Sequence, residues 1–118
     1  MSNLLIVDDE PVVVDTMVRK IILRFRGKYN LLVAHDGDEA IALIRKHPVD
    51  VLVLDIHMRN MDGVEVCRKI IQDGGIDKMK VIISSGCLTE DVQATLFAWG
   101  INHFLHKPYP MDELIKLL

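Results

Sequence analysis

The sequence has few of the features that mark disulfide-stabilised, membrane-spanning or nucleic-acid-binding proteins. Its two cysteines, Cys67 and Cys87, are too few and too far apart for a disulfide framework or a Cys-x-x-Cys metal site. The longest apolar runs are too short to cross a bilayer, and the first residues lack the basic and apolar regions of a signal peptide. A net charge of −3 argues against direct nucleic-acid binding. We therefore expect a cytoplasmic protein with no membrane contact.

The chain does have enough apolar sequence for one hydrophobic core. Of its 118 residues, 50% are hydrophobic and 26% are charged, a balance typical of a globular domain. This length predicts a single domain over residues 1–118. The last predicted helix is cut off at Leu118 without a capping residue. We therefore expect a domain excised from, or truncated at the junction to, a longer chain.

The most informative stretch is the run Val51-Leu52-Val53-Leu54, which ends abruptly in Asp55. A short run of branched apolar residues is typical of a central strand buried on both faces of a parallel sheet. Ligands of open α/β sheets bind outside the carboxyl ends of the strands. Asp55 is therefore predicted to be a reactive or binding group.

Four further strands alternate with helices along the chain. The strands are expected at residues 3–9, 29–35, 80–85 and 102–105. The first helix is expected to begin with Glu10 and Pro11. Three more are expected after the turn 36–39, the loop 57–63 and the capping residue Thr89, and a last one from Met111. The helix after the loop should direct four side chains toward the core: Val64, Cys67, Ile70 and Ile71. The alternation predicts an α/β fold, with five parallel strands and helices on both faces of the sheet.

Polar residues lie at or just after the ends of four of these strands. Asp8 and Asp9 close the first, Asp55 follows the third, Ser85 closes the fourth, and Lys107 lies just beyond the fifth. Because the carboxyl ends of parallel strands share one edge, these side chains are predicted to converge. Three neighbouring carboxylates hold a proton or recruit a hard cation, and Mg²⁺ (or Mn²⁺) prefers such oxygen ligands.

The same residues suit a phosphoryl group. The charge of Lys107 and the hydroxyl of Ser85 would complement its equatorial oxygens, which leaves Asp55 as the nucleophile. Each residue alone also has a structural explanation: Asp8 and Asp9 as acids at a helix start, Lys107 as surface, Ser85 as an ordinary strand-end hydroxyl. Their occurrence together favours a site.

In these residues the chain resembles, over its whole length, the receiver domain of response regulators in two-component phosphorelay systems, including chemotaxis regulators. The resemblance rests on Asp8-Asp9, Asp55, Met61-Asp62-Gly63, Ser85-Gly86 and Lys107-Pro108. It implies a flavodoxin-like sheet of strand order 2-1-3-4-5 and a phosphorylation-dependent signalling switch rather than an enzyme. The phosphoryl group would pass from the phosphohistidine of a histidine kinase or histidine phosphotransfer protein to Asp55, and the domain would assist this transfer and its own dephosphorylation.

The resemblance also implies a magnesium site. Asp9, Asp55 and the main-chain carbonyl of His57 would bind the ion, and Asp8 would act chiefly through a metal-bound water. Ser85 would then hydrogen-bond to the phosphoryl oxygen.

Three further features are implied in the same way. Lys107 would pair with the phosphoryl group, and its bond to Pro108 is expected to be cis. Phe104 would take the place of the aromatic switch residue, although it lacks the hydroxyl of the commoner Tyr and can only repack. Two positions depart from the usual pattern of this family: Arg59 replaces a common Pro, and Trp99 replaces a usually small residue.

His57 and Cys87 each lie two residues beyond a site residue and should flank the mouth of the pocket, near enough to touch. They are expected to set the lifetime of the phosphorylated state. A neutral imidazole could orient the attacking water, whereas a bulky pair could block it. The sequence does not decide whether the pair shortens or lengthens this lifetime.

A partner surface is expected on the helix after Thr89, the strand 102–105 and the helix from Met111. An output domain, a kinase or a second copy of the chain would bind there, as in similar receivers. Phe97 and Trp99 cannot both face inward at 3.6 residues per turn, so one of them should be exposed.

Two other functions remain open. A pseudo-receiver would bind partners without phosphorylation, but such a domain normally lacks one of the acids or the lysine, and here all are present. A hydrolase of the haloacid dehalogenase type would need a second Asp two residues after its nucleophile, where this chain has His57.

Overall fold

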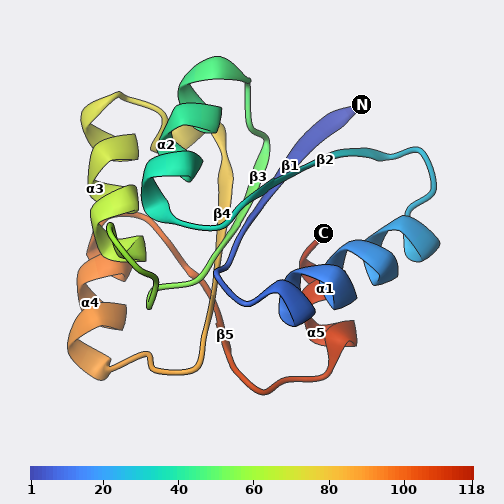
Figure 1. The fold of residues 1–118 in the computed structure, drawn as a ribbon. Helices are drawn as coiled ribbons and strands as arrows, with labels where there is room; N and C mark the ends of the chain where they lie inside the picture. The colour runs from blue at the N-terminus through green and yellow to red at the C-terminus, as the bar shows by residue number, and fades with distance from the viewer.

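The strands of the computed structural model, which describes all 118 residues, form one parallel sheet of order β2-β1-β3-β4-β5 (Figure 1). The strands are β1 Ser2–Val7, β2 Tyr29–Ala34, β3 Val51–Leu54, β4 Lys80–Ser85 and β5 His103–His106. The helices are α1 Pro11–Arg24, α2 Gly37–Lys46, α3 Gly63–Gln72, α4 Glu90–Ala98 and α5 Met111–Leu117, with a 3₁₀ turn, η1, at Ile76–Lys78. The predicted fold class and strand order are confirmed.

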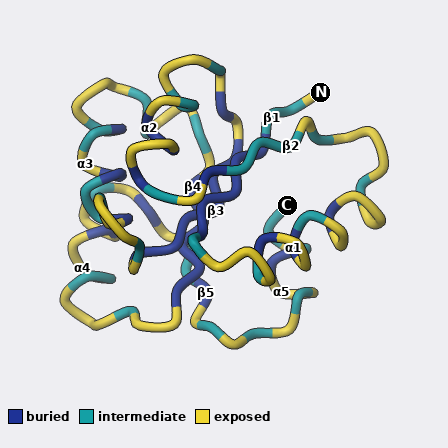
Figure 2. The backbone as a smooth tube through the Cα atoms, viewed as in Figure 1, coloured by how far each residue is buried: buried dark blue, intermediate teal, exposed yellow.

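Helices cover both faces of the sheet, so the core has two layers. Helices α2, α3 and α4 lie on one face, and α1 and α5 lie on the other (Figure 1). Because side chains alternate along a strand, Leu5 and Val7 of β1 pack toward the first group while Leu4 and Ile6 pack toward the second. Every residue of β3 is buried, as predicted for a central strand, and Figure 2 shows this buried band running through the middle of the molecule.

Side-chain caps fix where the helices after β2, β3 and β4 begin. The Asp36 carboxylate accepts a hydrogen bond from the Glu39 amide (2.8 Å), Asp62 accepts from Glu65 (3.0 Å), and the Thr89 hydroxyl accepts from Val92 (3.2 Å). The stretch 36–39, expected as a turn, is therefore already the first turn of α2.

Gly63 places the start of α3 directly against the end of β3. A Cβ at this position would lie 2.4 Å from the Asp55 carbonyl oxygen, so only glycine fits here without a shift of the main chain. The Gly63 amide donates to the Ile56 carbonyl at 2.8 Å, which closes the loop 57–62 beside Asp55.

Several local predictions differ from the structure. Strand β1 ends at Val7 rather than at residue 9, and Gly63, expected in the loop, is the first residue of α3. Strand β5 lies one residue later than expected, because the Ile101 amide still bonds to the Leu96 carbonyl of α4 (3.0 Å). In α3, Val66 is fully buried, whereas Val64 and Ile71 are only half-buried. The turn η1 was not predicted. No helix combines the length and the apolar character that a bilayer crossing requires.

Candidate functional site

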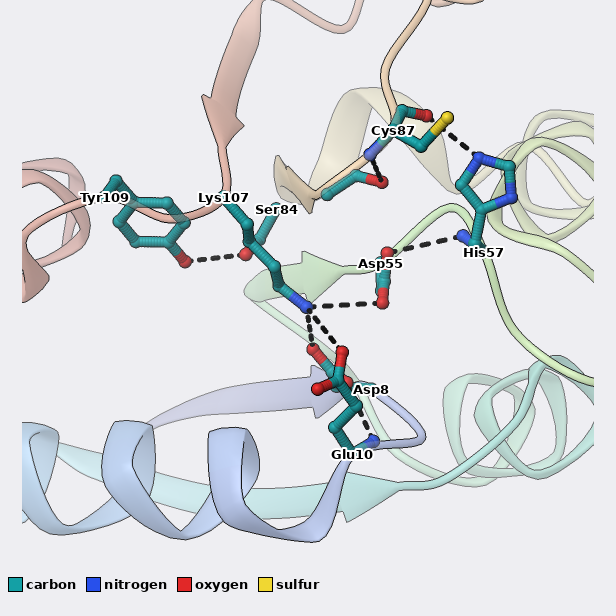
Figure 3. Close-up of polar contacts among 9 residues, drawn as sticks. Asp8, Glu10, Asp55, His57, Ser84, Cys87, Lys107 and Tyr109 are labelled. Carbon is teal, nitrogen blue, oxygen red and sulfur yellow. Dashed lines mark hydrogen bonds and ion pairs between the residues drawn. The ribbon is translucent and has the colours of Figure 1, made fainter.

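The carboxyl ends of the strands bring the predicted site residues to one edge of the sheet. Asp8, Asp55 and Ser85 are buried at the ends of β1, β3 and β4, with exposed fractions of 2%, 5% and 0%. Lys107 follows β5, and Figure 3 shows its side chain directed at Asp8 and Asp55. Asp9, half-buried, completes the set. The parallel topology thus assembles groups that are scattered along the chain.

Lys107 is the cation of this cluster. Its Nζ lies 2.6 Å from Asp8 Oδ2, 3.3 Å from Asp55 Oδ2 and 3.9 Å from Glu10 Oε1. Burial alone would lower the pKa of Lys107, but the hydrogen bond to Asp8 and the charges of Asp55 and Asp8 outweigh it and raise the pKa. The ammonium is therefore charged at neutral pH. The bond from Lys107 to Pro108 is cis, as expected.

Four carboxylates surround the position that a cation would occupy. Oxygen atoms of Asp8, Asp9, Glu10 and Asp55 all lie within 4.8 Å of one another. Such an all-oxygen donor set with no sulfur or imidazole suits a hard ion, so these residues fit Mg²⁺.

Glu10 was not among the predicted site residues, because it was assigned to the start of α1. It is the N-cap residue of α1, its amide donates to Asp8 Oδ1 at 2.9 Å, and its carboxylate lies in the same acidic cluster. Its position directly after Asp8-Asp9 is the sequence signal that could have identified it.

The Asp55 carboxylate is held from two sides. Its Oδ1 accepts a hydrogen bond from the His57 amide at 3.3 Å, and its Oδ2 faces Lys107. The Asp55 amide in turn donates to the Val7 carbonyl at 3.0 Å, which continues the β1–β3 pairing to this residue. A buried carboxylate with its orientation fixed is a suitable acceptor for an incoming electrophile.

His57 and Cys87 are in contact beside Asp55, as expected from their positions. The His57 Nε2 lies 2.9 Å from the Cys87 carbonyl oxygen, so the contact uses the main chain of Cys87 rather than its thiol. Since a carbonyl only accepts, Nε2 carries the proton. The Cys87 amide donates to Ser85 Oγ over 3.4 Å, a long hydrogen bond.

The two thiols differ in their surroundings. Cys87 is exposed, whereas Cys67 is buried in α3 and its pKa rises to about 12, through burial and then the charge of Asp62. Burial therefore makes the Cys67 thiol inert.

The remaining predicted residues lie around the site rather than in it. Phe104 is half-buried on β5 and packs on the α2–α4 side of the sheet. Arg59 is exposed and forms no ion pair. Phe97 of α4 is 64% exposed, which confirms that one of Phe97 and Trp99 faces outward. Trp99 is half-buried, and the Arg68 guanidinium lies over its indole ring, 5.8 Å from the ring centroid.

Sequence reasoning also missed a hydroxyl pair beside Lys107. Ser84 is 1% exposed, and its Oγ lies 2.6 Å from the hydroxyl of Tyr109. Burial raises the pKa of Tyr109, and the charges of Asp8 and Asp55 act in the same direction, against the opposing effects of Ser84 and Lys107. The only sequence signal was the proximity of Ser84 and Tyr109 to Ser85 and Lys107.

Comparison with known proteins identifies the family. Residues 4–118 match the family described as response regulator receiver domain. The chain belongs to this family. It is 38% identical over 113 residues to the response regulators MprA of Mycobacterium avium and Mycobacterium tuberculosis. These alignments cover 96% of the chain but 47% of each relative, so the chain spans about half the length of these curated proteins.

Solved structures give the same result for this receiver domain. A CheY-like receiver domain protein from Methanospirillum hungatei is 26% identical, with a TM-score of 0.85 over 98% of this chain and 89% of that one. The response regulator TrrA from Thermotoga maritima, solved in complex with Mg(2+)-BeF, is 26% identical with a TM-score of 0.80 over 100% of both chains. Receiver domains of response regulators are signalling domains of two-component systems, and membership of this family supports phosphorylation-dependent signalling.

Proposed function

We propose that this receiver domain accepts a phosphoryl group on Asp55 from the phosphohistidine of a histidine kinase or a histidine phosphotransfer protein. The observation that carries the proposal is the Lys107 ammonium, which contacts the buried carboxylates of both Asp8 and Asp55. Lysine and carboxylates rarely lie buried together unless they are paired or functional. A pseudo-receiver normally lacks one of these groups, and none is missing here.

Magnesium, or manganese in its place, would be held by Asp9, Asp55 and the His57 carbonyl, with Asp8 acting through a bound water. Glu10 joins this set because its carboxylate lies in the same cluster. When bound, the ion would neutralise charge on the phosphoryl oxygens. The related TrrA, solved with Mg(2+)-BeF, supports this assignment.

In the transfer, one Asp55 carboxylate oxygen forms a bond to phosphorus while the bond from phosphorus to the donor histidine nitrogen breaks. The nitrogen keeps the electron pair of the broken bond. Lys107 exchanges a carboxylate partner for a phosphoryl oxygen, which its long flexible stem allows. The Ser85 hydroxyl, held only by the long contact to the Cys87 amide, is free to donate to another phosphoryl oxygen.

The response to phosphorylation would pass from Ser85 and Phe104 to the surface of α4, β5 and α5. Phe104 pairs in register with Ile83 of β4, next to the strand end that carries Ser85. Phe97 supplies a large exposed apolar group on α4. A kinase, an output domain or a second copy of the chain would bind this surface.

The test is mass measurement after treatment with acetyl phosphate and Mg²⁺. We expect one added phosphoryl group in the native protein, none after Asp55→Asn and none in excess EDTA. Asp50→Asn is the matched control. Asp50 lies just before the first residue of β3, at the end of the strand away from Asp55, and its carboxylate accepts a hydrogen bond only from the Asn3 amide. Labelling that persists in Asp55→Asn would refute the acceptor, and labelling unchanged in EDTA would refute the metal requirement.

A further inference from the structure

The hydrogen bond between Ser84 and Tyr109 has no role in the transfer described above. It is the only side-chain hydrogen bond of either residue, and it joins the end of β4 to the loop between β5 and α5 (Figure 3). Ser84 is almost completely buried, so its hydroxyl depends on this one partner. Because Ser84 and Ser85 are neighbours in a strand, they point to opposite faces of the sheet. The pair therefore lies on the side away from Cys87.

Two contacts with β4 fix the loop that carries Lys107. The Lys107 amide donates to the Ser85 carbonyl at 2.8 Å, and Tyr109 bonds to Ser84 two residues later in the loop. The Lys107 stem leaves the loop at the first of these anchors and ends between Asp8 and Asp55. Loss of the Tyr109 hydroxyl would leave the loop attached to β4 by the main-chain contact alone.

We propose that Ser84 and Tyr109 are positioning residues that hold Lys107 within reach of Asp55. The proposal rests on the proposed phosphoacceptor function. Of the two buried carboxylates, Asp8 makes the shorter contact with the ammonium, 2.6 Å against 3.3 Å for Asp55. A loop that is free to shift lets the flexible lysine settle on Asp8. The hydroxyl pair prevents this shift, so that the ammonium stays where the phosphoryl group arrives.

A merely structural role makes a different prediction. If the pair only stabilised the fold, its removal would have the same effect on the reaction whether or not Lys107 were present. If the pair acts through Lys107, the effect disappears once the lysine has been removed. A double-mutant cycle between residues 109 and 107 separates the two.

The variants remove single atoms where the chain permits it. Tyr109→Phe removes one hydroxyl and Ser84→Ala removes its partner, whereas Ser84→Thr keeps a hydroxyl at the same position. Tyr29→Phe is the matched control, because Tyr29 is the only other tyrosine and its hydroxyl donates to the Leu118 carbonyl at 2.9 Å. Tyr29 is the first residue of β2, so it lies at the sheet edge opposite to Asp55. The rate of Asp55 phosphorylation by acetyl phosphate with Mg²⁺ is measured for each variant, with and without Lys107→Ala.

We expect Tyr109→Phe and Ser84→Ala to slow phosphorylation about three- to tenfold, the range of a moderate coupling between contacting residues. Ser84→Thr and Tyr29→Phe should stay near the native rate. In the Lys107→Ala background, Tyr109→Phe should change the rate by less than about twofold. A native rate in Tyr109→Phe, or an equal slowing in both backgrounds, would overturn the proposal.

A second measurement does not depend on phosphorylation. In lysine labelled with ¹³C, the ε-carbon signal of Lys107 should shift in Tyr109→Phe and stay in place in Tyr29→Phe. An unchanged signal would refute the positioning role. Failure of the native protein to label at Asp55 would instead refute the phosphoacceptor function, so the two failures are distinguishable.

Discussion

The two sides of Asp55 are built differently. Toward β1 and β5, the carboxylate faces buried charges at short range, with Lys107 between Asp8 and Asp55. Toward the carboxyl end of β4, the side-chain contacts beside Asp55 are long or exposed: the Cys87 amide reaches Ser85 Oγ over 3.4 Å, and His57 and Cys87 are both exposed. Buried charge pairs hold a fixed geometry because breaking one leaves an uncompensated charge. The first side is thus preorganised for chemistry, whereas the second is free to rearrange once the phosphoryl group is present.

The largest expected effect comes from breaking the charged side. Lys107→Ala removes the only cation near the carboxylates, and we expect phosphorylation of Asp55 by acetyl phosphate to fall by about a hundredfold, the typical loss for one charge-stabilising donor. The rate is measured by mass spectrometry over time. Lys116→Ala, which removes an exposed lysine of α5, should leave it unchanged. Equal rates in Lys107→Ala and the native protein would remove the basis for the distinction between the two sides.

A smaller effect is expected on the β4 side. The His57 imidazole donates to the Cys87 carbonyl beside Asp55, so His57→Ala should open a path for water and speed hydrolysis of the phosphorylated protein about three- to tenfold. Cys87→Ala keeps the carbonyl and should have less effect. Magnesium affinity should stay unchanged in both, since His57 would offer the metal only its main-chain carbonyl. The measurement is the decay of phosphoprotein after removal of acetyl phosphate.

The outcome also decides between the two possibilities that the sequence left open for this pair. Slower decay in His57→Ala would indicate an imidazole that orients the attacking water. Three indistinguishable half-lives would refute any kinetic role for the pair.

The sequence predicted the charged side of the site well, because that side follows from topology. Once strands were assigned before Asp8, Asp55 and Lys107, parallel pairing alone brought their ends together. Glu10 was missed because its recruitment depends on one local bond, from its own amide to Asp8. The pattern of strands and helices contains no information about such a turn.

Contacts between distant residues were also beyond sequence reasoning. Ser84 and Tyr109 are 25 residues apart, and only the β4–β5 register brings them together. The burial of Val66 depends on how α3 is rotated, which the close approach of Gly63 to Asp55 fixes. Periodicity gave the helix but not its exact rotation against the sheet.

The smallest expected effect is on stability at alkaline pH. The raised pKa of Lys107 means that the folded protein keeps this proton after the unfolded chain has lost it, above pH of about 10.4. The stabilisation from Lys107 is therefore complete below that pH and is lost as pH rises through the folded-state pKa. Lys107→Met lacks this contribution, so its free energy of unfolding should fall less steeply above pH of about 10.4 than that of the native protein. The two slopes should differ by at most about 1.4 kcal/mol per pH unit, the contribution of one proton.

Tyr109 complicates the comparison because burial raises its pKa too, so its own ionisation would add to the pH dependence. Urea unfolding from pH 9 to 11.5 should therefore compare Tyr109→Phe with Tyr109→Phe/Lys107→Met, in which only the lysine differs. Lys116→Met in the same background should keep the steeper slope, since this exposed side chain lies outside the charged cluster. If all three slopes coincide, the ammonium binds its proton no more tightly in the folded state than in the unfolded chain. The charged side would then lack the preorganisation that distinguishes it from the β4 side.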